Sequence, residues 1–171
     1  MALIPENITK IDRDEGLLTF LNTTPDTATK TFKVLGIGIT DYGISYNPSV
    51  DSEKWIIEKN SRQVHSSNEK QGSVTQTAYK GDPVFEFVAD GRDKLNYKTE
   101  ILDVDVFDGT ENNGVITAPA KLSAGMIAVT QWMSETASVE YDLYYSGDAV
   151  EGTATINTTS GEVSFTPTAS L

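Results

Sequence analysis

Apolar and polar side chains alternate along several short segments of this chain, and a period of two is the pattern of a β-strand with one buried face. In SVEYDLYY (138–145), Val139, Tyr141 and Leu143 fall on one face and two acidic side chains on the other. The sequence therefore predicts a mainly β fold: a sandwich or barrel-like domain of two packed sheets, with roughly seven or eight strands. The strands are expected within 32–46, 73–80, 101–107, 116–133, 138–145, 150–157 and 162–167, with turns at 146–148 and 158–161.

One segment carries the pattern of a helix instead. Asp82 is a favourable N-cap, Pro83 suits the first helical position, and Glu86 falls in the first turn. The apolar residues that follow have the spacing of one helix face. They are Val84, Phe87, Val88, Gly91 and Leu95. The sequence predicts a single flanking α-helix over 83–95.

Two polar regions stand apart from this pattern. Residues 1–31 are rich in turn-forming residues and predict an N-terminal arm, followed by a single β-domain over 32–171. Residues 47–72 are polar except at Trp55, Ile56 and Ile57, and predict a long flap of two strands. The Trp-Ile-Ile patch is either a contact point for a partner or a small cluster packed under the loop.

Composition excludes several kinds of site. The chain has no cysteine and one histidine, His65, which rules out disulfides, thiolate metal sites and multi-histidine zinc sites. No stretch approaches the length of a membrane span, so no membrane partner is expected. The net charge of −12 disfavours ordinary binding of phosphate. We expect neither enzymatic activity nor a cofactor or metal.

The paired carboxylates of Asp103 and Asp105 are the best candidates for chemistry. Lying two apart on one strand, they allow the spacing of a retaining glycosidase, and DVDVFDG (103–109) is close to a calcium loop. However, Glu100, Asp108 and Glu111 extend the charge around them, and the calcium-loop register is off by one residue. A solvated acidic surface is the simpler interpretation.

Four segments resemble a known family. They are EKWIIEKNS (53–61), YKGDPVFEFV (79–88), EILDVDVFD (100–108) and VEYDLYYSGDAVEGTATINTTSGEVSFTPTA (139–169). In their order and spacing they are similar to the major tail tube proteins of long, non-contractile-tailed phages (siphophages) of Gram-positive bacteria. The resemblance extends over most of residues 32–169 and includes no catalytic motif.

The resemblance implies a β-sandwich flanked by one helix, with six copies forming a ring and rings stacking into the tail tube. DNA would cross the lumen during ejection without adhering to it. The tape-measure protein would occupy the lumen beforehand, and the tail terminator and the distal tail or baseplate proteins would bind the tube ends. The protein would be part of the virion, assembled in the host cytoplasm.

Charge distribution suggests which residues would line such a channel. Residues 99–171 carry a net charge of −10, and an acidic lining would repel the DNA backbone. The first candidates for lumen-lining residues are Asp103 and Asp105, and the second are Glu140 and Asp142. The Trp55–Ile57 patch is the candidate contact between subunits. The alternative function is an Ig-like or carbohydrate-binding β-sandwich module of a phage or cell surface protein.

Overall fold

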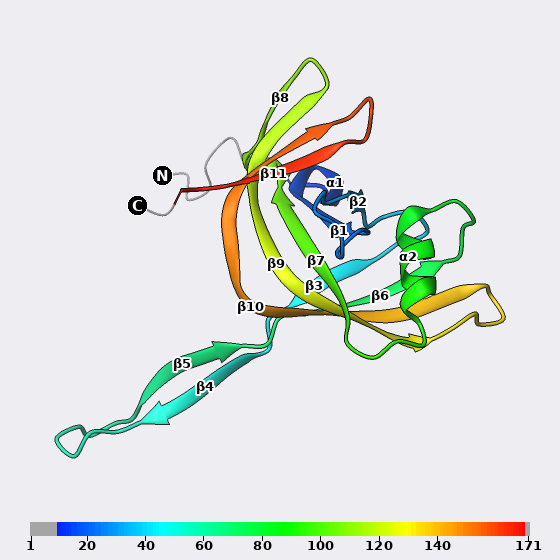
Figure 1. Ribbon diagram of the computed structural model, residues 1–171. Coiled ribbons are helices and arrows are strands. Elements are labelled where there is room, and N and C mark those ends of the chain that lie inside the picture. The colour runs from blue at the N-terminus through cyan, green and yellow to red at the C-terminus, as the bar shows by residue number, and fades with distance from the viewer. Residues whose placement is uncertain (1–9, 170–171) are drawn as a thin grey trace.

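A computed structural model describes residues 10–169 of the chain, and its strands form one large antiparallel sheet with a separate two-stranded hairpin (Figure 1). The order of strands in the large sheet is β2-β1-β7-β9-β10-β6-β3, with β8 added to β9 and β11 to β10. The elements are α1 (Arg13–Gly16), β1 (Leu17–Asn22), β2 (Phe32–Val34), β3 (Tyr42–Ser45), β4 (Pro48–Glu53), β5 (Arg62–Asn68), β6 (Gln71–Thr77), α2 (Pro83–Gly91), β7 (Tyr97–Asp105), the 3₁₀ turn η1 (Val106–Asp108), β8 (Thr110–Asn112), β9 (Val115–Gln131), β10 (Ser138–Asn157) and β11 (Val163–Pro167).

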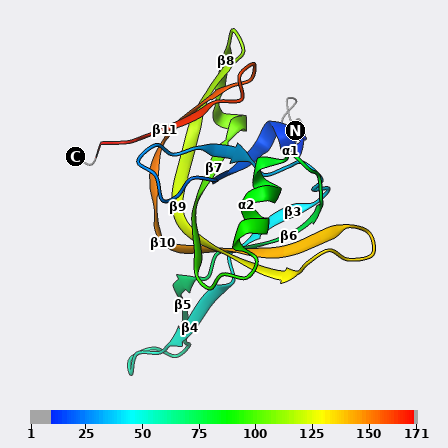
Figure 2. The same ribbon diagram turned by 45° about the vertical axis from the view of Figure 1, so that its right-hand side comes forward.

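The prediction of a mainly β fold with one flanking helix is confirmed, and this helix, α2, is nine residues long. Within the described residues the strands do not close into a barrel, and the layered arrangement is that of a sandwich. The expected pair of sheets is one continuous hydrogen-bonded sheet that bends, as Figures 1 and 2 show along β9 and β10. The short helix α1 is an addition that the sequence pattern did not predict.

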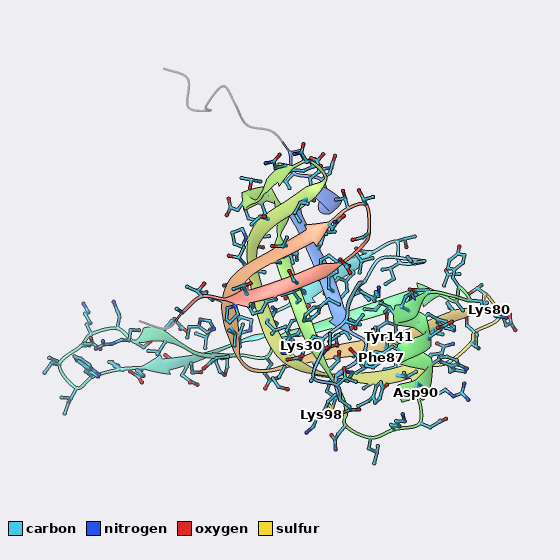
Figure 3. The ribbon with its side chains drawn as sticks, turned by 45° about the horizontal axis from the view of Figure 1, so that its top comes forward. Lys30, Lys80, Phe87, Asp90, Lys98 and Tyr141 are labelled. Carbon is cyan, nitrogen blue, oxygen red and sulfur yellow. The ribbon has the colours of Figure 1, made fainter. Side chains whose placement is uncertain are left out.

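The two halves of the bent sheet bury opposite faces. One core cluster, around Tyr141 of β10, lies on the face that α2 covers, and Figure 3 shows Phe87 of α2 beside it. The second cluster lies on the other face, around Ala118 of β9. Because side chains alternate along a strand, the neighbours Ile101 and Leu102 of β7 point into different clusters. The central strands are therefore buried on both sides.

The long strand β10 passes through both halves. The sequence predicted a turn at 146–148, which is wrong: the strand continues from Ser138 to Asn157 beside β9. A bulge between Ser146 and Val150, with Gly147 at a positive φ, interrupts the pairing with β9, and a bulge bends the strand that contains it. A local turn signal inside a strand that pairs with β9 before and after it therefore produced a bulge.

Residues 17–22 correct the predicted N-terminal arm. They form β1, which pairs with β7 on one side and β2 on the other. The run LLTFLN is apolar on both faces, and Phe20 and Leu21 are buried in opposite clusters. Such a run is typical of a strand covered on both sides. Part of the predicted arm, residues 1–9, lies outside the described residues.

The helix α2 begins where the sequence predicted and ends four residues early. The Asp82 carboxylate accepts hydrogen bonds from the backbone N–H groups of Val84 and Phe85 (3.2 and 3.4 Å). Gly91 is the last helical residue, and the ring of Tyr97 lies where a β-carbon at that position would be. Leu95 lies beyond the helix and is 93% exposed, so its predicted place on the buried face is wrong.

The predicted flap is a hairpin of β4 and β5 that stands clear of the large sheet (Figures 1 and 2). Its strands pair with each other from Pro48–Asn68 at the base to Glu53–Arg62 near the tip. Residues 71 and 72, placed in the flap by the sequence pattern, instead begin β6 and pair with β10.

Candidate assembly surfaces

The tip of the hairpin carries an exposed apolar patch. Ile56 is fully exposed, Ile57 is 85% exposed and Trp55 is 56% exposed. The alternative of a small cluster packed under the loop is therefore wrong for the two isoleucines. Apolar side chains gathered at the end of a projecting element are typical of a contact with another molecule.

The tip is held in shape by its own contacts. The Arg62 guanidinium lies 3.7 Å from the centre of the Trp55 ring and donates a hydrogen bond to Glu58 (2.8 Å). The Glu58 carboxylate in turn accepts a hydrogen bond from the backbone N–H of Trp55 (3.1 Å). These contacts fix the turn and leave Ile56 and Ile57 exposed.

At the root of the hairpin, Lys70 is anchored to the core by Asp103. The Lys70 ammonium donates to Asp103 Oδ2 (2.8 Å), and both side chains are largely buried. The hydroxyls of Thr19 and Tyr145 donate to Asp103 Oδ1 (2.9 and 3.2 Å). Burial and the adjacent Asp103 charge raise the pKa of Tyr145 well above its usual value. The strands β1, β7 and β10 and the connection between β5 and β6 thus meet at one carboxylate.

This geometry corrects the interpretation of Asp103. The residue is 6% exposed, and both of its carboxylate oxygens accept hydrogen bonds from the chain itself. It is therefore neither the solvated surface charge nor the exposed lining charge that the sequence suggested. Its neighbour Asp105 is half-buried at the end of β7, opposite Leu17 of β1.

The second acidic pair lies on an open surface. Glu140 is exposed, and Asp142 is half-buried and accepts a hydrogen bond from the Ser73 hydroxyl (2.7 Å). Both project from the face of β10 opposite to the one that packs against α2.

The two acidic pairs face opposite sides of the sheet. Asp103 is paired with Lys121 of β9, and Asp142 with Ala128 of β9. Residues directly opposite one another point to the same side, and residues an odd number apart on one strand point to opposite sides. A single surface formed by one face of this sheet can therefore contain only one of the two predicted pairs.

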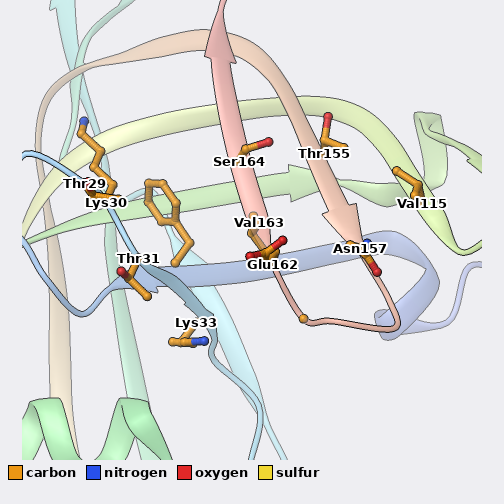
Figure 4. A pocket seen from close by; sticks show the side chains of 12 residues that line it. Thr29, Lys30, Thr31, Lys33, Val115, Thr155, Asn157, Glu162, Val163 and Ser164 are labelled. Atoms are coloured by element: carbon orange, nitrogen blue, oxygen red, sulfur yellow. The ribbon is translucent and has the colours of Figure 1, made fainter.

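An open seam lies between β2 and β11, and the sequence analysis missed it. The two strands run close together without pairing. Figure 4 shows the hollow at this seam, of about 540 Å³, where Thr31 and Lys33 face Glu162 and Ser164. Its lining mixes lysine, threonine and serine side chains with Phe32, Val115 and Val163, unlike that of the hollow beside it.

The neighbouring hollow, of about 340 Å³, is mostly apolar, and we call it the seam groove. It lies between β1, β2, the first turn of α2 and the strands β10 and β11. The exposed Val34 and Ile37 on its rim are the sequence signal that could have indicated it. Its apolar walls are Leu18, Phe20, Val34, Ile37, Ile156 and Val163.

Searches for other features add little. Across residues 10–169 there is no cluster of three or more histidine or acidic side chains that could hold a metal ion. None of the helices described is long and apolar enough to cross a membrane. A scan against protein-family models finds no match for this chain, and a search of the curated proteins finds none either.

Proposed function

We propose that this protein is a structural subunit that assembles into hexameric rings, which stack into the tail tube of a siphophage virion. The tube would be a negatively charged channel through which DNA passes during ejection. The tape-measure protein, the tail terminator and the distal tail proteins would be its partners, and assembly would take place in the host cytoplasm. The observation that carries this proposal is the projecting hairpin with Ile56 and Ile57 uncovered at its tip.

Unpaired strand margins also support self-assembly. Among the described strands, β2 and β3 end the main sheet and β11 is bonded to β10 alone, so each presents one side without a strand partner. Such margins favour pairing with further strands unless they are blocked. Pairing between copies in a ring would cover them, and contacts between rings that do not close on themselves would extend the assembly as a tube.

The face opposite α2 is the most suitable lumen surface. In the half of the sheet that α2 covers, no helix lies on this opposite face, which carries Glu140 and Asp142 together with polar side chains such as Ser73 and Thr75. In the other half, the same face buries the second core cluster. A ring of six chains would carry a net charge of six times −12, or −72. An acidic, polar lining repels phosphates and leaves a duplex free to slide. Asp103 has no part in this lining.

Electron microscopy and sedimentation velocity of the purified full chain test the proposal. We expect six-fold rings and tubes as protein concentration and salt are raised, because salt screens the repulsion between acidic chains. A chain that sediments as a monomer under all these conditions, with no rings on the grid, would contradict it.

The alternative, a plain Ig-like or carbohydrate-binding module, accounts poorly for two elements. An Ig sandwich has no place for α2, which supplies Val84, Phe87 and Val88 to the core, or for a hairpin projecting from the sheet. A binding module would stay monomeric in the same experiment, so the two functions give different outcomes.

A further inference from the structure

We propose that the seam groove of one copy receives the hairpin tip of a second copy of this chain. The inference rests on the proposed self-assembly and names the two surfaces that meet. The tip would insert Ile56 and Ile57 between the apolar walls of the groove, which include Val34 and Ile37.

The two surfaces match in chemistry. The groove is a mostly apolar hollow of about 340 Å³, while the tip presents two adjacent isoleucines with almost no contacts of their own. Burying both surfaces removes from water the apolar area that each leaves exposed in the single chain. The Trp55–Arg62–Glu58 contacts already hold the tip in shape, which lowers the entropy lost on docking.

The charge of the tip favours contact with another copy of the chain. The tip segment 54–62 contains three basic residues and one acidic residue, a net charge of +2 on a chain of net charge −12. Of the residues that line the groove, Lys33 and Asp82 are charged and offset each other, and the exposed Glu162 lies next to the groove residues Gly161 and Val163. The tip is therefore one of the few parts of this molecule that another copy would attract.

The position of the surfaces requires a second copy. In Figures 1 and 2 the hairpin extends downward from the sheet, whereas the turn between β10 and β11, beside the groove, lies at the top. A tip cannot reach the groove of its own chain. Two different patches at opposite ends make a head-to-tail contact, which propagates as an open filament.

Disulfide trapping tests the contact directly, because the chain has no cysteine of its own. Ile57→Cys protein is mixed with Ile37→Cys protein and oxidised, and the yield of linked dimers is measured on a non-reducing gel. The matched control pairs Ile57→Cys with Leu95→Cys, since Leu95 is an exposed apolar residue outside the groove. We expect the groove pair to link at least several times faster than the control pair, and equal rates would overturn the inference.

Substitutions at exposed positions provide a second measurement. Ile57→Ser and Ile37→Glu should each weaken self-association about tenfold and leave the melting temperature unchanged, because both side chains are exposed in the single chain. Leu95→Ser should change neither. If Ile57→Ser abolishes association while Ile37→Glu leaves it intact, the tip docks elsewhere. If Ile37→Glu alters only the melting temperature, the chain's own residues fill the groove. Either result overturns the inference.

The outcomes for the groove and for the tube are separable. Specific cross-links without rings or tubes would retain the docking contact and reject the tail-tube function. Tubes that form without preferential cross-linking, and that Ile37→Glu does not disturb, would retain the function and reject the docking contact.

Discussion

At the scale of single residues, Asp103 and Lys70 decide how the hairpin meets the body of the molecule. The ion pair between them is largely buried, and three further hydroxyl groups form a chain around it: Thr19 and Tyr145 bind the carboxylate, and the hydroxyls of Tyr42 and Tyr145 lie 3.2 Å apart. Removing one partner of a buried pair leaves the other charge without compensation. This explains why two charged residues can lie so far inside a small β-protein.

We predict that Lys70→Met lowers the free energy of unfolding by about 3–5 kcal/mol, the usual cost of breaking a buried pair. Urea denaturation followed by circular dichroism measures this change. Lys98→Met, at an exposed lysine of β7, is the matched control and should change stability by less than about 0.5 kcal/mol. Similar losses for the two variants would mean that the ion pair makes no special contribution.

Buried phenols predict a loss of stability at alkaline pH. Burial and the hydrogen bond to Asp90 raise the pKa of Tyr97 to about 12, and burial, with nearby carboxylates, also raises the pKa of Tyr141 and Tyr145. In the unfolded chain a tyrosine ionises near pH 10, roughly its unperturbed value. The native state therefore keeps protons that the unfolded state loses, so this stabilisation is complete below pH 10 and declines as pH rises above it.

Denaturation curves between pH 8 and pH 12, together with phenolate absorbance, check this prediction. For Tyr97 the loss should be complete near its folded pKa of about 12. Tyr97→Phe should lose less stability over the same interval. The prediction is wrong if all seven tyrosines of the native protein ionise together near pH 10 without unfolding.

At the scale of elements, α2 packs on the core, whereas the hairpin projects from the sheet. The helix covers one face of the sheet, and its cap is joined to the core because Gln76 donates to Asp82 (2.6 Å) and accepts from the Tyr141 hydroxyl (2.8 Å). The hairpin, in contrast, pairs only with itself and contributes no residue to either core cluster. We therefore expect α2 to govern stability and the hairpin to govern assembly.

Asp82→Ala should lower the free energy of unfolding by about 2–4 kcal/mol. The change removes the N-cap and also leaves the buried Gln76 amide without one of its acceptors. Chemical denaturation of this variant is compared with that of Asp93→Ala, an exposed acidic residue beyond the helix, which should change stability little. If the free energy of unfolding falls by less than about 1 kcal/mol, the cap and its hydrogen bond to Gln76 do not contribute to stability as predicted.

Replacing residues 49–67 with a two-residue Asn-Gly turn should spare the fold and prevent assembly. Pro48 and Asn68 are already paired, so a tight turn can join them, and Lys70 and β6 are retained. Melting temperature and electron microscopy are measured on the same preparation. Tubes of normal length from this variant would exclude a role for the hairpin between rings.

At the scale of the whole molecule, the bent sheet separates two kinds of surface. In the half of the sheet that α2 covers, the opposite face is open and carries Glu140 and Asp142, while Asp105 belongs to the other face of the sheet. The net charge of −12 makes neighbouring copies repel one another, so association has to come from local apolar contacts and strand pairing.

Charge reversal distinguishes the two faces. In assembled tubes, Glu140→Lys with Asp142→Lys should make short duplex DNA bind in low salt, because a basic lining binds phosphates with release of counterions. The matched variant Asp105→Lys with Glu151→Lys, on the other face, should retain less DNA. Co-sedimentation of labelled DNA with the tubes is the measurement, and greater binding by the second variant would place the lining on the opposite face.

Local signals in the sequence were sufficient for part of this structure. The period of two in SVEYDLYY indicated a strand with Val139, Tyr141 and Leu143 inside, and all three are buried. Asp82 and Pro83 indicated the start of α2, because a cap depends only on atoms within one helical turn. The polar composition of 47–72 indicated a projecting hairpin, because a segment with so few apolar side chains cannot join a core.

The tertiary structure alone decided the rest, because it depends on residues far apart in the sequence. Asp103 is buried only because Thr19 and Lys70, 84 and 33 residues away in the chain, reach its carboxylate. The LLTFLN segment is an interior strand because β2 and β7 pair with its two edges. The seam groove exists because β2 and β11 approach each other without pairing. Strand alternation is a local property of the chain, whereas the side of a sheet that is covered is a property of the whole fold.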